Sequence, residues 1–254
     1  MRLSSQAEME EGLRGVEGWF SPDEAWALHE SIRNLSPERP ITVVEIGSSR
    51  GRSTIAAGHA LLARAKGGTL YAIDPQNDEL FGQLRANVEG ARVQSVVNLI
   101  RATSREARKE FGDHEVDLIF IDGSHEYEDV RDDLRDWLPL VRPGGIVAVN
   151  DPFWWGVARA LRERLSLRGE LRSPRLMQNT LFFSYLPDSR WTRRDGRELL
   201  QVRACFLVAR VGGSLLALTG ASRVLPQRLK RPVLRTMFRL LIRCFSWLLP
   251  TAKT

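Results

Sequence analysis

Apolar residues divide the first 187 positions into short continuous runs and longer amphipathic stretches. The short runs, rich in β-branched residues, are 41–46, 69–73, 93–100, 116–121 and 145–149. The stretches between them, with apolar positions spaced as on one helical face, are 53–65, 79–89, 105–111 and 127–138. Continuous apolar strands that alternate with helices predict a parallel sheet covered on both faces, which is a doubly wound α/β fold.

The ends of this pattern set the expected boundaries. Ser21, Pro22 and Glu24 form a helix start signal, with a serine cap, a first-turn proline and a capping box, so a helix is expected to about residue 35. A helix near 156–165 and two closing strands at 167–176 and 180–186 complete the pattern. We expect a cap or lid helix in 1–40, the sheet domain in 41–187, and a linker with a basic, largely helical extension in 188–254.

The composition is that of an ordinary folded protein, with 254 residues, 43% of them hydrophobic and 27% charged. Only Cys205 and Cys244 are present, too few for a disulfide scaffold and without the spacing of a metal site. The start lacks a signal-peptide pattern, and the longest uncharged stretches have 12 residues, against roughly 20 in a membrane-spanning helix. A cytoplasmic protein is therefore expected.

Charge is distributed unevenly along the chain. Residues 199–254 hold ten of the 37 Lys and Arg residues and none of the 31 acidic ones, so the net charge is +10 there and −4 in the first 198. Arginines recur at 231, 235, 239 and 243, opposite apolar positions of a helix, which predicts peripheral binding of the tail to an anionic membrane surface at the inner face of the membrane. Packing of the tail on the main domain or on a second subunit is the alternative, and a nucleic-acid partner is not expected.

Ligand sites of doubly wound sheets lie beyond the carboxyl ends of the strands. The first such end reads Glu-x-Gly-x-x-x-Gly-x-Ser over 45–53, which is neither a dinucleotide fingerprint nor a P-loop. Gly47 and Gly51 allow a tight turn and close approach of a ligand, although a glycine turn without a ligand is the alternative. Asp74 follows the next strand and suits a ribose diol there, or simply caps a turn.

Polar residues also follow two later strands. Asp122 and His125 share one loop, and Asn150 and Asp151 end the next strand. Two carboxylates and an amide oxygen suit Mg²⁺, and an imidazole there suits a general base. Each residue also has an alternative without a role in catalysis, as a helix cap, a turn residue or a surface histidine.

Together these residues resemble a known family. The segments that carry the resemblance are 18–25 (GWFSPDEA), 43–54 (VVEIGSSRGRST), 72–75 (AIDP), 118–127 (LIFIDGSHEY) and 142–151 (RPGGIVAVND). They are similar to class I S-adenosylmethionine-dependent methyltransferases, in particular to the metal-dependent macrolide-sugar O-methyltransferase and cephalosporin hydroxylase-like branch. Two departures are Ser49, in place of a glycine, and Asn150, in place of an acidic residue.

The resemblance implies a role for each candidate residue. The implied cofactor-binding residues are Glu45, Gly47, Ser48, Gly51, Ser53, Asp74, Thr103 and Ser104, with Asp74 on the ribose and Thr103 and Ser104 near the adenine. It also implies a metal at Asp122, Asp151 and Asn150, and His125 as the catalytic base.

The implied fold is a Rossmann-like methyltransferase sheet, and the implied activity is methyl transfer from S-adenosylmethionine to a hydroxyl of a sugar or sugar-bearing small molecule, assisted by Mg²⁺. Metal-independent methylation of another small acceptor is one alternative, and a catalytically silent adapter anchored by its tail is another. Trp19, Phe20, Trp154 and Trp155 either close over the site or pack in the core. Homo-oligomer formation is left open.

Overall fold

The computed structural model describes residues 5–36, 38–167 and 169–187. Its strands are β1 (Ile41–Ile46), β2 (Gly68–Ile73), β3 (Val97–Ile100), β4 (Val116–Ile121), β5 (Val141–Asn150), β6 (Leu171–Met177) and β7 (Thr180–Tyr185). Its α-helices are α1 (Gln6–Gly12), α2 (Pro22–Arg33), α3 (Arg52–Ala63), α4 (Asp78–Gly90), α5 (Ser104–Phe111), α6 (Tyr127–Trp137) and α7 (Trp155–Leu167). Two short 3₁₀ turns, η1 (Gln94–Val96) and η2 (Leu138–Leu140), precede β3 and β5.

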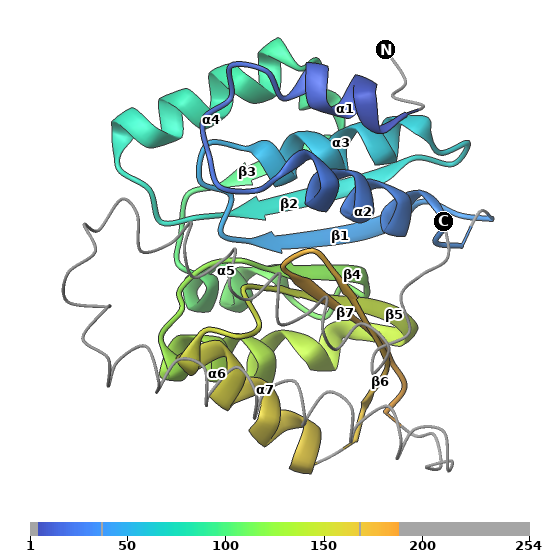
Figure 1. The fold of residues 1–254 in the computed structure, drawn as a ribbon, viewed down its shortest axis with the longest axis vertical. Helices are drawn as coiled ribbons and strands as arrows, with labels where there is room; N and C mark the ends of the chain where they lie inside the picture. Colours follow the sequence, from blue (N-terminus) through green and yellow to red (C-terminus); the bar gives the residue numbers. More distant parts are fainter. Residues whose placement is uncertain (1–4, 37, 168, 188–254) are drawn as a thin grey trace, which may run out of the picture.

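The seven strands form one sheet in the order β3-β2-β1-β4-β5-β7-β6. The first five are parallel to one another, whereas β7 runs antiparallel between β5 and β6. Helices α1 to α4 cover one face and α5 to α7 the other, as Figure 1 shows. The prediction of a doubly wound, Rossmann-like sheet is confirmed.

Alternate residues of the strands build two separate cores. In β4, Leu118 and Phe120 pack with α1 to α4, while Ile119 and Ile121 pack with α5 to α7. All four are at most 2% exposed. A strand that is buried on both faces is apolar at most of its positions, which explains the nearly continuous apolar runs in the sequence.

Local signals account for most helix boundaries. Ser21 and Glu24 form the expected capping box at α2, and Thr103 and Glu106 form a second one at α5. Asn77 caps α4 through its side chain. These caps satisfy N–H groups that the first turn of a helix leaves without partners.

Several boundaries differ from the expected ones. Strand β3 begins at Val97 rather than at 93, because Val93 instead packs against Gly58 of α3 and a 3₁₀ turn follows it. Strand β6 begins at Leu171, because α7 continues to Leu167. Helix α1 was not predicted, since it buries only Met9 and has little periodicity.

No helix in the described ranges is both long and apolar enough to span a membrane. The predicted basic extension at 188–254 lies outside the described residues, so its helix and its binding to a membrane surface stay predictions. The domain boundaries are likewise retained as predictions.

Candidate active site

One cavity of about 750 Å³ lies at the carboxyl ends of β1, β2, β4 and β5. Parallel pairing of these strands brings their ends to the same edge of the sheet. Ten of the twelve predicted site residues line this cavity: Gly47, Ser48, Ser53, Asp74, Thr103, Ser104, Asp122, His125, Asn150 and Asp151. The other two, Glu45 and Gly51, belong to the same motif without lining the cavity.

The loop between β1 and α3 depends on its glycines. Gly47 has φ of 90° and Gly51 has φ of 95°, in the left-handed region that other residues avoid. A side chain on Gly47 would also collide with the carbonyl oxygen of Asp122, so the loops after β1 and β4 approach closely. Gly51 is the N-cap residue of α3 and supplies no side-chain cap. The first-turn N–H groups of α3 therefore suit an anionic ligand group.

Glu45 stabilises this loop through buried hydrogen bonds. Its side chain is 1% exposed, and Oε2 accepts hydrogen bonds from the hydroxyls of Ser48 (2.9 Å) and Thr54 (2.6 Å). Burial raises the pKa of Glu45 to about 7, although hydrogen bonds from neighbouring hydroxyl groups oppose the shift. The position of Glu45 fits an indirect role, in which it holds the loop that carries Ser48.

Glu45→Gln should remove a pH-dependent loss of stability. The folded-state pKa lies above the ordinary value of 4.5, so the folded protein binds more protons than the unfolded chain between these values, and stability falls as pH rises through this window. The variant should be more stable than wild type by about 1 to 3 kcal/mol at pH 8, with the difference shrinking towards pH 4. Denaturant unfolding across this pH range measures it, and a difference independent of pH would contradict it.

Asp74 lies beside the same loop, at the end of β2. Its Oδ2 atom accepts hydrogen bonds from the backbone N–H groups of Ser48 (2.9 Å) and Ser49 (2.8 Å). Its other oxygen forms no hydrogen bond within the described residues. Asp74 thus fixes the loop after β1 and keeps one carboxylate oxygen for a ligand in the cavity.

A histidine and an aspartate are paired at the opposite side of the cavity. Nε2 of His125 lies 2.9 Å from Oδ2 of Asp151, and the side-chain amide of Asn179 donates to Oδ1 of Asp151. Asp151 is 8% exposed and has φ of 48°, an uncommon backbone conformation for this residue. The His125 ring packs against Trp154, with ring centroids 5.1 Å apart. Asp151 is therefore held from two sides and orients the imidazole.

Asp122 lies next to this pair and keeps some exposed surface in the cavity. Burial among protein atoms raises its pKa well above its usual range, and the negative charge of Asp151 adds to the effect. The Asn150 side chain hydrogen-bonds the Asp122 carboxyl group and accepts a bond from Thr180 (3.1 Å) through Oδ1.

The predicted metal ligands Asp122, Asn150 and Asp151 all line the same cavity. Both carboxylate oxygens of Asp151 and the amide oxygen of Asn150 are already paired with protein donors. Within the described residues, no three His, Cys, Asp or Glu side chains are grouped to hold a metal ion. This donor set does not fit the predicted magnesium site.

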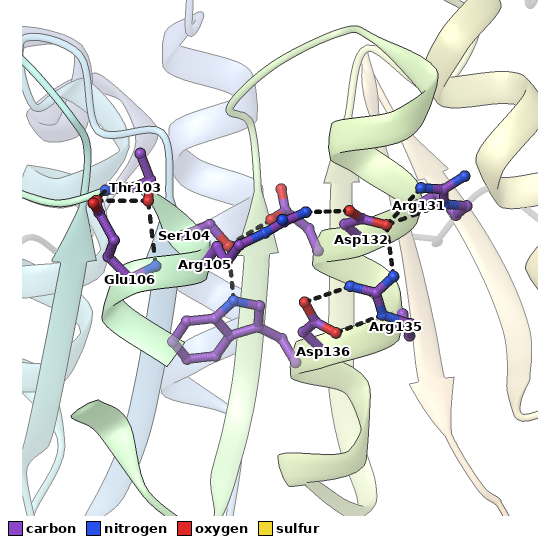
Figure 2. A network of polar contacts seen from close by, with 10 residues as sticks. Thr103, Ser104, Arg105, Glu106, Arg131, Asp132, Arg135 and Asp136 are labelled. Atoms are coloured by element: carbon purple, nitrogen blue, oxygen red, sulfur yellow. Dashed lines mark hydrogen bonds and ion pairs between the residues drawn. The ribbon is translucent and has the colours of Figure 1, made fainter. Parts of the chain in front are cut away.

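The edge of the cavity at α5 is a hydrogen-bonded network (Figure 2). The Ser104 hydroxyl donates to the Asp133 carboxylate and accepts a bond from Nε1 of Trp137 (2.8 Å). Burial raises the pKa of Asp133 to about 6. This network links α5 to α6 and fixes the position of Ser104, for which the family resemblance implies a place near the adenine.

A second set of contacts in Figure 2 consists of ion pairs, one between α5 and α6 and the others within α6. Arg105 of α5 pairs with Asp132 of α6 at 2.6 Å, and Arg135 reaches Asp132 at 2.9 Å and Asp136 at 2.6 Å. These arginines are largely exposed, so the pairs contribute little stability individually. They hold the acidic side chains of α6 at the rim of the cavity.

Several lining residues were not predicted. One face of α6 contributes the acidic residues Asp129, Asp132, Asp133 and Asp136. Their spacing of three and four residues shows in the sequence that they share a helical face, but not that the face borders a ligand site. Asn179, in the turn between β6 and β7, had no sequence signal.

Four aromatic residues were expected either to close over the site or to pack in the core, and the structure shows both arrangements. Phe20 is 5% exposed and packs on Phe120, with centroids 5.3 Å apart, yet it also borders the cavity. Trp19 is 57% exposed and lines the cavity, as does Trp154. Trp155 is 65% exposed and does not line it.

Comparison with known proteins agrees with this geometry. Residues 44–152 match the family described as a methyltransferase domain. An uncharacterized protein, y4gI, from Sinorhizobium fredii is 30% identical over 169 residues, which are 61% of this chain and 19% of that protein. An uncharacterized protein, R132, from Acanthamoeba polyphaga mimivirus is 28% identical over 131 residues, 48% of this chain and 56% of that protein. The matches thus span about a fifth and about half of these relatives.

Solved structures share the fold. An O-methyltransferase from Bacillus cereus, in complex with SAH, superimposes with a TM-score of 0.56 at 15% identity, over 72% of this chain and 92% of that one. The O-methyltransferase TomG from Streptomyces achromogenes, in complex with SAM, gives 0.53 at 17% identity, over 71% and 89%. Residues 44–152 thus resemble a methyltransferase domain, and the sheet has the fold of these solved O-methyltransferases.

Proposed function

We propose that this protein transfers a methyl group from S-adenosylmethionine to a hydroxyl oxygen of a small acceptor. The observation that carries the proposal is that one cavity has polar binding groups at two different ends. The glycine loop and Asp74 lie at one end, and the His125 and Asp151 pair lies at the other. A donor and an acceptor bound at these ends would meet between them.

The residues at the donor end suit S-adenosylmethionine. The close turn at Gly47, the uncapped N-terminus of α3 and the second oxygen of Asp74 supply a narrow loop, N–H donors and a carboxylate acceptor. These groups fit a carboxylate and a ribose diol, respectively, of one ligand. When bound, S-adenosylmethionine supplies an activated methyl group, and its transfer to oxygen breaks the methyl–sulfur bond and leaves S-adenosylhomocysteine.

The residues at the acceptor end suit removal of a proton. Nε2–H of the neutral His125 imidazole donates a hydrogen bond to Asp151, which leaves Nδ1 as the proton acceptor. His125 then takes the hydroxyl proton as the oxygen attacks the methyl carbon, and Asp151 stabilises the imidazolium that forms. The remaining contribution of the protein is to hold the two reactants in line and exclude water.

We propose a sugar or a sugar-bearing small molecule as the acceptor. Polar lining groups such as Asp122 and Asn179 suit several hydroxyl groups, and Trp19 and Trp154 suit the apolar face of a ring. Many acidic and few basic residues line the cavity, which favours a neutral acceptor over an anionic one.

Methyl transfer should continue when divalent cations are removed, because the predicted ligand oxygens are already paired with protein donors. We expect activity within about twofold of its starting value after dialysis against EDTA, since the proposed proton acceptor is His125. The measurement is the initial rate with and without added Mg²⁺. Loss of activity in EDTA and its return with Mg²⁺ would contradict this prediction and support a metal site at Asp122 and Asp151.

The experiment for the proposed function uses full-length protein and S-adenosylmethionine labelled in the methyl group. The acceptors are neutral glycosides and phenols, with phosphorylated sugars and coenzyme A thioesters as anionic comparisons. Labelled methyl ether and S-adenosylhomocysteine should appear together with a neutral hydroxyl compound. Absence of transfer to every neutral acceptor, despite cofactor binding, would contradict the proposed acceptor class.

A further inference from the structure

The segment Glu17–Phe20, before α2, forms one wall of the cavity. Its two aromatic residues are placed differently. Phe20 is buried against Phe120 of β4, whereas Trp19 remains 57% exposed while lining the cavity. Phe20 thus anchors the backbone, and the neighbouring Trp19 borders the cavity with much of its surface exposed.

Arg52 holds this wall in place. It is the first residue of α3, directly after the glycine loop, and its guanidinium donates to three carbonyl oxygens of the N-terminal segment. Nε donates to Phe20 at 2.6 Å, and Nη1 donates to Val16 at 2.5 Å and to Leu13 at 3.2 Å. A planar guanidinium can satisfy several carbonyls in a fixed geometry, whereas a lysine ammonium cannot reproduce the same fork.

Gly18 shows how closely the chain wraps around Arg52. Its φ is 152°, and a Cβ atom there would lie 2.8 Å from Cδ of Arg52. A side chain at this position would therefore push Arg52 away from the carbonyls that it binds. Close packing of the segment on Arg52 therefore requires glycine at position 18.

Contacts of α2, which directly follows the wall, place this end of it near the His125 and Asp151 pair. Gln178 donates to Asp23 of α2 at 2.9 Å, and the next residue, Asn179, binds Asp151. The charge of Glu24 in α2 also acts on Asp122. The start of α2 therefore lies beside the end of the cavity at β4 and β5, whereas Glu17, at the other end of the wall, pairs with Arg50 of the glycine loop at 3.6 Å.

We propose that Trp19 contacts the methyl acceptor and that Arg52 is the residue that positions it. This inference rests on the proposed function, because it needs the acceptor to bind at the His125 end. The indole face packs against a ring of the acceptor, either the C–H face of a sugar or an aromatic ring, and orients its hydroxyl towards His125. Asp74 and the glycine loop bind the donor, and Trp19 belongs to neither.

Steady-state kinetics of Trp19→Ala test the direct contact. The acceptor is the neutral hydroxyl compound that wild type methylates in the labelled-methyl assay. We expect KM for this acceptor to rise about tenfold or more, with the Kd of S-adenosylmethionine within about twofold of wild type. Trp155→Ala is the matched control, because Trp155 is comparably exposed without lining the cavity, and it should behave as wild type.

A double-mutant cycle tests the positioning role of Arg52. Arg52→Ala should raise acceptor KM in the same direction as Trp19→Ala, and the combined variant should add little to Trp19→Ala alone. Arg52→Lys should restore only part of the loss. A purely structural effect of Arg52 would instead add fully to that of Trp19→Ala and would overturn the positioning role.

The outcomes separate this inference from the proposed function. If wild type methylates no acceptor, the proposed function fails and the inference fails with it. If wild type is active and Trp19→Ala keeps the wild-type KM for the acceptor, only the inference is overturned. A weaker Kd for S-adenosylmethionine in Trp19→Ala, with unchanged acceptor KM, would place Trp19 on the donor instead.

Discussion

His125→Ala is expected to slow methyl transfer by about 10² to 10⁴, the usual effect of removing a general base. The imidazole is the group that Asp151 orients in the cavity, with Nε2 2.9 Å from the carboxylate. Cofactor affinity should stay within about threefold of wild type, because the glycine loop and Asp74 lie at the other end of the cavity. Single-turnover rates at saturating S-adenosylmethionine separate the chemical step from binding.

Two further measurements distinguish a base from a packing residue. Asp151→Asn keeps the size of the side chain but places an N–H group where an oxygen now accepts a bond, so it should also slow transfer. The dependence of rate on pH that protonation of an imidazole causes should be absent from His125→Ala. A His125→Ala enzyme with the wild-type rate would remove His125 from the mechanism.

Asp74→Ala is expected to weaken S-adenosylmethionine binding by about 1.5 to 3 kcal/mol, which is roughly a 10- to 150-fold rise in Kd. The substitution removes the proposed acceptor for the ribose diol. It also leaves the N–H groups of Ser48 and Ser49 without the carboxylate that now fixes them at 2.9 and 2.8 Å. Both effects act on the loop that binds the donor.

Asp74→Asn is the matched control for this prediction. Its amide oxygen can still accept bonds from the loop, whereas its NH₂ group cannot accept one from a ribose hydroxyl. We expect an intermediate Kd for this variant and an unfolding transition close to that of wild type. Calorimetric titration with unchanged affinity in Asp74→Ala would exclude Asp74 from the donor site.

The fold and the location of the site followed from the sequence for a physical reason. Strands such as β4, buried on both faces, are apolar at nearly every position, so their limits are visible as runs. Parallel pairing then requires Asp74, Asp122 and Asp151 to meet at one edge, although 77 residues separate the first from the last. Residues that directly follow strands were therefore predictable members of the cavity.

Contacts made by turns and helix faces were not predictable in the same way. Asn179 reaches Asp151 only because β7 inserts antiparallel beside β5, which brings the turn before β7 to the end of β5. Arg52 appeared as one residue of a glycine motif, and nothing local to it indicates binding to the carbonyls of Leu13 and Phe20. The metal prediction rested on residue types, whereas the pairing of their oxygens depends on neighbours such as Thr180.

Titration of the full-length wild-type protein with S-adenosylmethionine, followed by calorimetry, tests the central claim most directly. The account predicts saturable binding of one molecule per chain, with a Kd in the range of about 1 μM to 1 mM that is typical of enzyme substrates. It also predicts competition by S-adenosylhomocysteine for the same site. Absence of any heat of binding up to about 1 mM S-adenosylmethionine, confirmed by equilibrium dialysis, would contradict the account.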